Sequence, residues 1–439
     1  MGQRQKGGKD IRFKLRFLDS YQFLSAGLAS LVQKLPRDMF HITRNQIGDY
    51  DWLFRKGIFL YTWFNNVDKL EDNALPPKEA FYDTLTQACN ITDEEYQIAQ
   101  SVWTSSSCHT FKDYLEVYLK ADVCQLADVF QNFRKMCLSQ DGLKTVNYIT
   151  IPQLTWDSAF KYTQSQCQLI TDAEMYGFFE SGIRGGMSFV NTHYNKANSP
   201  TMQENSDVMQ DVAHEILYVD ENNLYGAALS MRLPQWGFTW MTQEELNSID
   251  WVHVDTEGDE GYTLEVTLEY PAAIHDETQD LPFAPERLTP KSEWLSDMQH
   301  AQRKLAYAQE NTYHGTAKLL LTQFHKCNYV VHFKILQFYL KHGMRISKLH
   351  RGVKYVQAAF FEPYVSFNSR ERQATSDKML QDFYKLKNNN LYGKTMENLR
   401  RRRNFKLLND EVQHQKLCCR DSFLESIMFT PNLVGVSLD

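Results

Sequence analysis

The feature that most constrains the fold is a long helical pattern in the first third of the chain. Between Thr110 and Met136, apolar residues recur at intervals of three and four, which is the spacing of one face of an α-helix. The pattern predicts a single long amphipathic helix. Tyr118 and Asp122 are four residues apart in it, so their side chains are expected to share a face.

Other segments show strand patterns, so the chain is expected to be an α+β protein. A carboxylate that ends a strand just before a helix, as Asp19 would, is a common place to hold a metal, although many such aspartates only cap the helix. Alternation of apolar and other residues predicts strands over 11–19, 185–194, 214–226 and 262–270. The strand over 214–226 is expected to deliver Asp220. Helical spacing appears over 21–35, 291–341 and 370–386, and a connection is expected over 148–155.

The composition is that of a globular protein. The chain has 439 residues, of which 43% are hydrophobic, enough for a large core and two to four domains. Its eight cysteines form no CxxC pair and no Cys/His metal spacing, which argues against a zinc site. Without a signal peptide or an apolar run of about 18 residues, the sequence predicts no membrane span and reduced thiols in a cytoplasmic or nuclear setting.

The charge is unevenly distributed, although the formal net charge is only -7. Residues 201–280 contain 18 Asp or Glu and one Lys or Arg, whereas residues 341–420 contain 18 Lys or Arg and seven Asp or Glu. Phosphate binding depends on positive charge within about 8–10 Å, so the net charge does not exclude it. The basic segment, including Arg400, Arg401, Arg402 and Arg403, is therefore predicted to face DNA. For the arginine run alone, the alternative is a helix end exposed to solvent.

The most informative motif is KLKNNNLYGKTMEN, which starts at Lys385. On a helix, Lys385 offers a point charge to a triphosphate, and Asn389 and Tyr392 follow on nearly the same face. Gly393 leaves room for a base pair, although a lysine before Tyr-Gly can also be a plain solvated helix end. The pattern resembles motif B of the family B DNA polymerases of the protein-primed, viral, organellar and virus-like transposon kind. Asn390 stands where that motif has serine.

A second motif, YVDENNLYG, begins at Tyr218 and resembles motif A of the same family. The resemblance implies that Asp220 is catalytic and binds the divalent metal ions, and that Tyr225 packs under the deoxyribose. Asn223 and Gly226 replace the serine and proline of the motif. An isolated aspartate at a strand end is usually structural, but here motif B follows motif A in the expected order, 165 residues later.

A glycine loop, GIRGGMS, lies upstream of both motifs. It resembles the YxGG-type loop that touches template phosphates in protein-primed polymerases. Gly185 and Gly186 would let backbone N–H groups approach an anion, and Arg184 adds positive charge. A tight turn without a ligand is the alternative.

The N-terminal third resembles the end of a 3′–5′ exonuclease domain. RFLDSYQF would supply Asp19, and VYLKAD would supply Tyr118 and Asp122, the two aspartates being metal ligands. A two-metal nuclease site needs about four carboxylates. The DxE motif expected before Asp19 is not in the preceding 18 residues, so the chain is not expected to degrade DNA from its 3′ end. A Tyr–Asp pair can also be ordinary helix surface.

The resemblance covers the chain from Ile11 to about Leu438 and implies an order of parts. A partial RNase H-like exonuclease domain over 1–145 precedes a palm segment with motif A over 146–233, an insertion over 234–351, helical fingers with motif B over 352–399, and a return to the palm over 400–439. Motif C, the DTDS-like turn with the other metal-binding aspartate, would lie beyond motif B and is not in the sequence. We therefore expect this chain not to polymerise DNA by itself.

The function implied is DNA-directed DNA polymerase, a nucleotidyltransferase of DNA replication. A complete enzyme would use two Mg²⁺ ions, with Mn²⁺ as a substitute, and would bind template-primer DNA and dNTPs, with a terminal protein as an alternative primer. Another hypothesis is a nucleic-acid-binding polymerase remnant without catalysis. A third is an interaction protein whose basic segment binds acidic partners.

Overall fold

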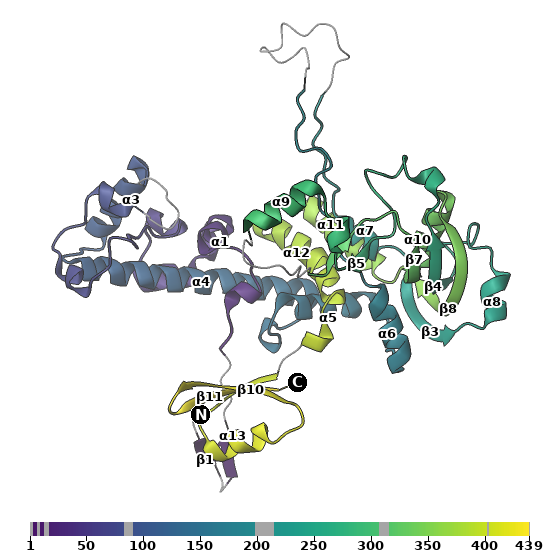
Figure 1. The fold of residues 1–439 in the computed structure, drawn as a ribbon. Helices are drawn as coiled ribbons and strands as arrows, with labels where there is room; N and C mark the ends of the chain where they lie inside the picture. The colour runs from purple at the N-terminus through teal and green to yellow at the C-terminus, as the bar shows by residue number, and fades with distance from the viewer. Residues whose placement is uncertain are drawn as a thin grey trace, which may run out of the picture. The chain divides into compact units, whose positions relative to one another are not determined.

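The computed structural model describes residues 3–6, 9–12, 17–82, 91–197, 215–306, 316–401 and 404–438. Helices and antiparallel sheets occur together, so the expected α+β class is confirmed (Figure 1). Two compact units make up the chain. The first combines Met1–Tyr162 with Ser366–Asp439, and the second is Thr163–Val365.

The first unit is built on α4 (Phe111–Asp141), the long helix that the apolar spacing predicts (Figure 1). Thr110 caps its start in a capping box with Asp113, which satisfies the first backbone N–H groups. The helix ends where Gly142 adopts the left-handed conformation, with φ of 62°, that glycine tolerates at low cost. It therefore runs five residues beyond the predicted end at Met136.

Two hydrophobic clusters pack along α4, one on each half. Phe111 and Tyr114 on the N-terminal half contact buried residues of 52–102, while Phe133 and Met136 on the other half contact Phe383. The surrounding helices are α1 (Leu28–Lys34), α2 (His41–Ile47), α3 (Asp93–Ser105), α5 (Ile151–Thr163), α11 (Glu362–Ala374), whose first turn belongs to the second unit, and α12 (Lys378–Thr395). The helix that carries motif B is thus held in the same core as α4.

Two small antiparallel sheets complete the first unit. One is the hairpin of β1 (Gln3–Lys6) and β2 (Lys9–Arg12). The other has the order β10-β11-β9, from β9 (Asn404–Leu408), β10 (Phe423–Thr430) and β11 (Leu433–Leu438). Leu417 of α13 (Glu411–Cys418) packs on its buried face against Val436 and Leu438.

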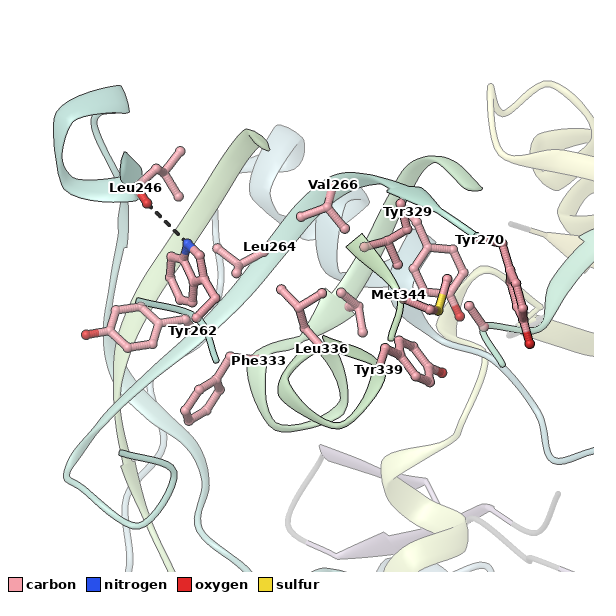
Figure 2. Packing of buried hydrophobic residues seen from close by; sticks show 14 of the residues in the cluster. Leu246, Tyr262, Leu264, Val266, Tyr270, Tyr329, Phe333, Leu336, Tyr339 and Met344 are labelled. Carbon is pink, nitrogen blue, oxygen red and sulfur yellow. Dashed lines mark hydrogen bonds between the residues drawn. The ribbon is translucent and has the colours of Figure 1, made fainter. Parts of the chain in front are cut away.

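The second unit is a four-stranded antiparallel sheet with helices on both faces. Its order is β3-β8-β4-β7, from β3 (Leu233–Trp240), β4 (Glu260–Glu269), β7 (Lys326–His332) and β8 (Arg345–Ala358). Leu264 and Val266 of β4 pack against Leu336 of α10 (Phe333–Lys341) (Figure 2). On the opposite face, Phe178 of α6 (Ala173–Gly182) packs against Val353 of β8.

The second unit contains further short elements outside this sheet. They are α7 (Leu224–Leu229), α8 (Gln243–Ser248), α9 (Asp297–Ala306), and the strands β5 (Glu286–Leu288) and β6 (Lys318–Leu320), which pair with each other. The strand predicted over 262–270 is confirmed as β4. The helical segment predicted over 291–341 is only partly correct, because β6 and β7 lie between α9 and α10.

Several predicted elements near the N-terminus and in the middle of the chain are only partly correct. β2 contains the first two residues of the strand predicted over 11–19, and residues 13–16 lie outside the described residues. Residues 17–19 lie in no strand, and Asp19 instead caps a short 3₁₀ turn, accepting the N–H of Tyr21 at 2.9 Å. The helix predicted over 21–35 begins only after Gly27. The expected connection over 148–155 already contains the first turn of α5, because buried Ile151 and Leu154 pack into the core. The helix predicted over 370–386 is broken, since Asp377 caps a new helix, α12.

The two strands predicted over 185–194 and 214–226 are absent from the described residues of those segments. A strand is stable only when a neighbour accepts and donates its backbone hydrogen bonds, and no described strand pairs with residues 215–220. The apolar side chains there face solvent, Tyr218 being 93% exposed. Asp220 is therefore not delivered by a strand in this structure. Residue 214 lies outside the described residues.

Candidate functional site

Motif B lies on α12, whose start is fixed by its own sequence. The Asp377 carboxylate accepts the backbone N–H groups of Met379 at 2.8 Å and Leu380 at 3.2 Å. Such a cap satisfies donors that the first turn of a helix leaves without partners, and its negative charge suits the helix N-terminus. The helix runs without interruption to Thr395, so the helical setting predicted for the motif is confirmed.

The motif B side chains divide between two faces of α12. Lys385 and Asn389 are exposed and Tyr392 is half-buried, so the three lie on the open side, as their four- and three-residue spacing predicts. Gly393 is exposed, and a Cβ added there would meet no atom within 4 Å. The opposite side is buried and consists of Met379, Phe383, Tyr384, Lys387, Asn388 and Leu391.

A pocket of about 230 Å³ opens beside the exposed face of α12. Lys385 and Asn389 form part of its wall, and Lys34 of α1 reaches the same pocket, where its ammonium lies 2.6 Å from the Asp382 carboxylate. Apolar residues of α1 and α4 supply the floor, including Leu31, Phe133 and Met136. The sequence did not predict that Lys34 lies in this pocket, because Lys34 belongs to a helix about 350 residues upstream of α12.

The substitution of Asn390 for the serine of motif B has a local explanation. Its side-chain amide donates a hydrogen bond to the Leu386 carbonyl at 2.7 Å, one helical turn earlier. A serine hydroxyl commonly makes the same bond within a helix. The replacement is therefore accommodated within α12 without using the exposed face.

Motif A lies in the second unit, and its last three residues form the start of α7. Asp220 is exposed in a segment without regular structure. Asn223 then takes a left-handed conformation, with φ of 58°, and begins α7. Asparagine is one of the few residues other than glycine that visit this region, which accounts for it at the position of the motif serine. Tyr225 is 48% exposed and Gly226 is buried.

The Tyr118–Asp122 pair predicted to share a face of α4 does so. Tyr118 is hydrogen-bonded to Asp122, its hydroxyl also contacts that of Tyr61, and its ring stacks on Phe59 with the centroids 4.8 Å apart. Burial raises the pKa of the Tyr118 hydroxyl. Burial also raises the pKa of Asp122, although the hydrogen bond from Tyr118 and the charge of Lys56 oppose that effect.

The exonuclease-like residues do not form a metal site within the described part of the chain. Asp122 does have one oxygen, Oδ1, that is buried without a hydrogen-bond partner and could accept a cation. However, no group of three or more His, Cys, Asp or Glu side chains comes together among the described residues. Asp19 and Asp220 are both exposed. The residues that the structure describes thus bring together fewer carboxylates than a two-metal centre requires.

We predict that Asp122→Asn raises the melting temperature at neutral pH, because it removes a charge that burial disfavours. The folded state raises the pKa of Asp122 and so favours its protonated form. The protonated form of Asp122 therefore makes its full contribution to stability at low pH. That contribution is lost as pH rises through the folded-state pKa, because the buried carboxyl group then ionises. Thermal melts between pH 4 and pH 8 test this. A gain that grew as pH fell would contradict it.

The glycine loop is placed beside the sheet of the second unit. Arg184 donates hydrogen bonds to the carbonyls of Gly182 at 3.1 Å and Val330 at 2.7 Å, and its guanidinium lies 3.8 Å from the centre of the Tyr329 ring. Gly185 and Gly186 are exposed, and a Cβ added to either would meet nothing within 4 Å. Arg184 therefore has a structural role, and phosphate binding by this loop stays a prediction.

The basic segment 341–420 is divided between the two units. Arg351 and Lys354 in the second unit and Lys387 in the first pair with acidic side chains, so their charge is used internally. Arg400 is exposed, and Arg401 ends a 3₁₀ turn. Arg402 and Arg403 lie outside the described residues. The exposed basic residues include Lys341, Arg345, Lys348, Arg370, Arg372, Lys378, Lys385, Lys416 and Arg420.

The sequence was compared with models of known protein families. The model described as DNA polymerase type B, organellar and viral, matches residues 5–422, nearly the whole chain. The chain belongs to the organellar and viral type B DNA polymerases. The family consists of DNA-directed DNA polymerases, which are nucleotidyltransferases and generally use divalent metal ions. Among curated proteins, none matches the sequence of this polymerase chain at a significant level.

Solved structures of phi29 DNA polymerase are similar to this type B chain. An orthorhombic crystal form is 12% identical, with a TM-score of 0.40 over 87% of this chain and 48% of that chain. A ternary complex with primer-template DNA and incoming nucleotides is also 12% identical, with a TM-score of 0.40 over 85% and 47%. The type B chain thus spans about half the length of these polymerases. The family assignment rests on the family model alone.

No helix in the part of the chain that the structure describes is both long and apolar enough to cross a membrane.

The family match and the order of the motifs agree with the resemblance found in the sequence. Sequence reasoning missed Lys387 and Asp141, which form a buried ion pair behind motif B. Nothing in the sequence indicated that either residue is buried. A lysine two residues after Lys385 and an aspartate at a helix end both usually lie on the surface.

Proposed function

We propose that this chain supplies motifs A and B of a DNA-directed DNA polymerase, which adds deoxynucleotides to a primer under the direction of a DNA template. The observation that carries the proposal is the geometry of α12. Its outward face presents Lys385, Asn389 and half-buried Tyr392, in a chain that belongs to the type B polymerases. A lysine ammonium on this face can bind a triphosphate, and open space at Gly393 leaves room for a base pair.

The metal chemistry of the proposed reaction needs more carboxylates than the described residues bring together. Asp220 is the residue that would contribute one carboxylate toward Mg²⁺, or Mn²⁺ in its place. When bound, a pair of such ions neutralises charge on the transferring phosphoryl group. Tyr225, five residues later and 48% exposed, is the residue to which the proposal assigns contact with the deoxyribose. The proposed partners are template-primer DNA and dNTPs, with a terminal protein as an alternative primer.

Primer extension tests the function directly. The purified chain is incubated with template-primer DNA, labelled dNTP and either Mg²⁺ or Mn²⁺, beside the Asp220→Ala variant. Template-directed extension that Asp220→Ala abolishes would establish catalysis by this chain. Extension that is unaffected by Asp220→Ala would overturn the assignment of Asp220.

A second candidate function is nucleic-acid binding without catalysis. The exposed position of Asp220, with no cluster of three metal-ligating side chains among the described residues, favours it. In that case the chain binds DNA and nucleotide but extends no primer with either metal ion. Extension of the primer by this chain would exclude this candidate. Binding that depends on Lys385 without extension agrees both with this candidate and with the expectation that the chain does not polymerise DNA by itself.

We predict that Lys385→Ala weakens binding of a fluorescent dATP analogue by about tenfold, or ~1.4 kcal/mol. The substitution removes the exposed ammonium that faces the triphosphate in the proposed complex. Fluorescence titration in the presence of Mg²⁺ measures the effect. Lys378→Ala is the matched control, since Lys378 is an exposed lysine in the first turn of the same helix. Equal losses in both variants would mean that the effect is only one of net charge.

We also predict that DNA affinity falls by at least about tenfold between ~50 and ~200 mM salt, because each neutralised phosphate releases counterions. Fluorescence anisotropy with labelled duplex measures the slope of affinity against salt. Lys416→Glu and Arg420→Glu, both exposed in the basic segment, should make the slope shallower. Lys112→Glu, an exposed control on α4 outside that segment, should not. Affinity independent of salt would contradict phosphate binding by the basic segment.

A further inference from the structure

A buried ion pair lies directly behind the exposed face of motif B. The Lys387 ammonium is 2.6 Å from Oδ1 of Asp141, and the two side chains are 0% and 4% exposed. Asp141 is the last residue of α4, and the Ser158 hydroxyl of α5 donates to the same carboxylate oxygen at 2.8 Å. The pair therefore joins α12 to the C-terminal end of α4 and to α5, all within the first unit.

Two further polar contacts hold the same side of α12. The Tyr384 hydroxyl donates to Oε1 of Gln140 at 3.0 Å, and the Asn368 amide of α11 donates to Oδ1 of Asn388 at 3.0 Å. Tyr384, Lys387 and Asn388 are spaced by three and four residues, so they form one stripe along the helix. Three directional polar contacts thus join this stripe of α12 to the end of α4 and to α11. Apolar side chains could pack in the same place, but without a preferred direction.

The cost of burying two charges indicates that the Lys387–Asp141 ion pair is not primarily a source of stability. Moving two charges out of water costs several kcal/mol for each ion, and a well-packed apolar pair of similar volume is often as stable. What an ion pair adds is direction, because it is favourable only at one separation and one orientation of the two helices. The best-attested use of a buried polar contact is to select one register of packed helices.

We propose that Lys387 is a positioning residue, whose ion pair with Asp141 fixes the rotation and axial register of α12 so that Lys385 and Asn389 face the nucleotide. A slip of one residue would turn the helix by about 100° and carry Lys385 away from its present direction. This inference rests on the proposed function for its purpose, but the fixing of the helix is a separate physical claim.

The decisive comparison is between two ion pairs that tie α12 to neighbouring helices at the same 2.6 Å separation. Lys387→Met with Asp141→Leu replaces the buried pair by apolar side chains. Lys34→Met with Asp382→Leu makes the same change in the pair between α1 and α12, whose side chains are 36% and 57% exposed. The full chain is used for both, and thermal melts establish that each double variant is folded.

Amide hydrogen exchange reports on the helix without requiring activity. In the Lys387/Asp141 double variant we expect exchange over 381–395 to accelerate about tenfold, with α2 and α3 unchanged. The Lys34/Asp382 double variant should leave it unchanged. Titration with the fluorescent dATP analogue should show binding weakened about threefold in the Lys387/Asp141 double variant. The Lys34/Asp382 double variant is a control for hydrogen exchange alone, because both of its residues line the pocket beside Lys385. Unchanged protection of α12 in a folded Lys387/Asp141 double variant would overturn the inference.

Two further outcomes are decided by the same measurements. If the Lys387/Asp141 double variant does not fold, Asp141→Asn replaces it, since it removes the negative charge of the ion pair and keeps the side-chain volume and an acceptor for Ser158. Normal protection of α12 in Asp141→Asn would then count against the inference. If the unaltered chain binds no nucleotide, the proposed function fails, whereas the exchange data still decide whether the ion pair fixes the helix.

Discussion

Replacing Lys387 alone by methionine is expected to lower the free energy of unfolding by about 3–5 kcal/mol. Methionine keeps most of the aliphatic volume, so the change leaves little empty space. It removes the cation and leaves the carboxylate of Asp141, whose side chain is 4% exposed, without its charge partner. An uncompensated charge in an apolar environment is much more costly than the loss of a pair. Urea unfolding followed by far-UV circular dichroism measures the loss.

The control for this prediction is the same substitution two residues earlier. Lys385→Met is also a lysine-to-methionine change on α12, but Lys385 is exposed and should alter stability by no more than about 0.5 kcal/mol. Similar losses at the two positions would show that helix propensity or net charge is responsible. A loss confined to Lys387→Met would attribute the effect to burial.

The helices that matter most for the site could be predicted from local sequence. Spacing of apolar residues by three and four predicted α4, and the spacing of Lys385, Asn389 and Tyr392 predicted that motif B lies on one open helix face. Both signals are local, because helix hydrogen bonds and side-chain faces depend on residues within four positions. The bounds were less accurate, since they depend on caps such as Asp377 and Gly142.

The contacts behind motif B could not be predicted from sequence. Lys387 and Asp141 are 246 residues apart, and charged residues are almost never fully buried unless paired. A helical pattern assigns such a lysine to the solvent face by default. Only the packing of α12 against the end of α4 shows that Lys387 belongs to the buried stripe.

Strand prediction failed where pairing, rather than pattern, decides the structure. Residues 215–220 have the composition of a strand, yet no described strand pairs with them. β4 was predicted correctly but for an incomplete reason, because its alternation suggested one buried face. Thr263 and Glu265 are buried as well, since β4 is a central strand with helices on both faces of its sheet. Glu265 is tolerated there because Arg351 pairs with it.

The family and the metal site differ in how far sequence could establish them. The order of motifs A and B pointed to the polymerase family, and the family model confirms it over residues 5–422. A metal site depends instead on several carboxylates meeting in space, which single motifs do not determine. Asp19, Asp122 and Asp220 each match a motif, but they do not form a cluster among the described residues.

A second buried carboxylate, Asp128 of α4, stabilises the start of α2. It accepts the backbone N–H groups of Ile42 and Thr43, each at 2.8 Å, and the Thr43 hydroxyl at 2.7 Å. The residue at the N-cap position of α2 is Phe40, which makes no side-chain cap. A carboxylate from another helix thus satisfies donors that the local sequence leaves without a cap.

Asp128→Ala is therefore expected to lower the free energy of unfolding by about 3 kcal/mol, because it leaves two buried donors and one part-buried donor without their acceptor and removes a charge that favours the helix N-terminus. Asp128→Asn keeps one acceptor oxygen in nearly the same volume and should lose roughly half as much. Urea unfolding gives the free energies, and amide exchange over 41–47 should accelerate in the alanine variant before the rest of the unit unfolds. A loss below about 1 kcal/mol in Asp128→Ala would mean that water replaces the carboxylate at these donors.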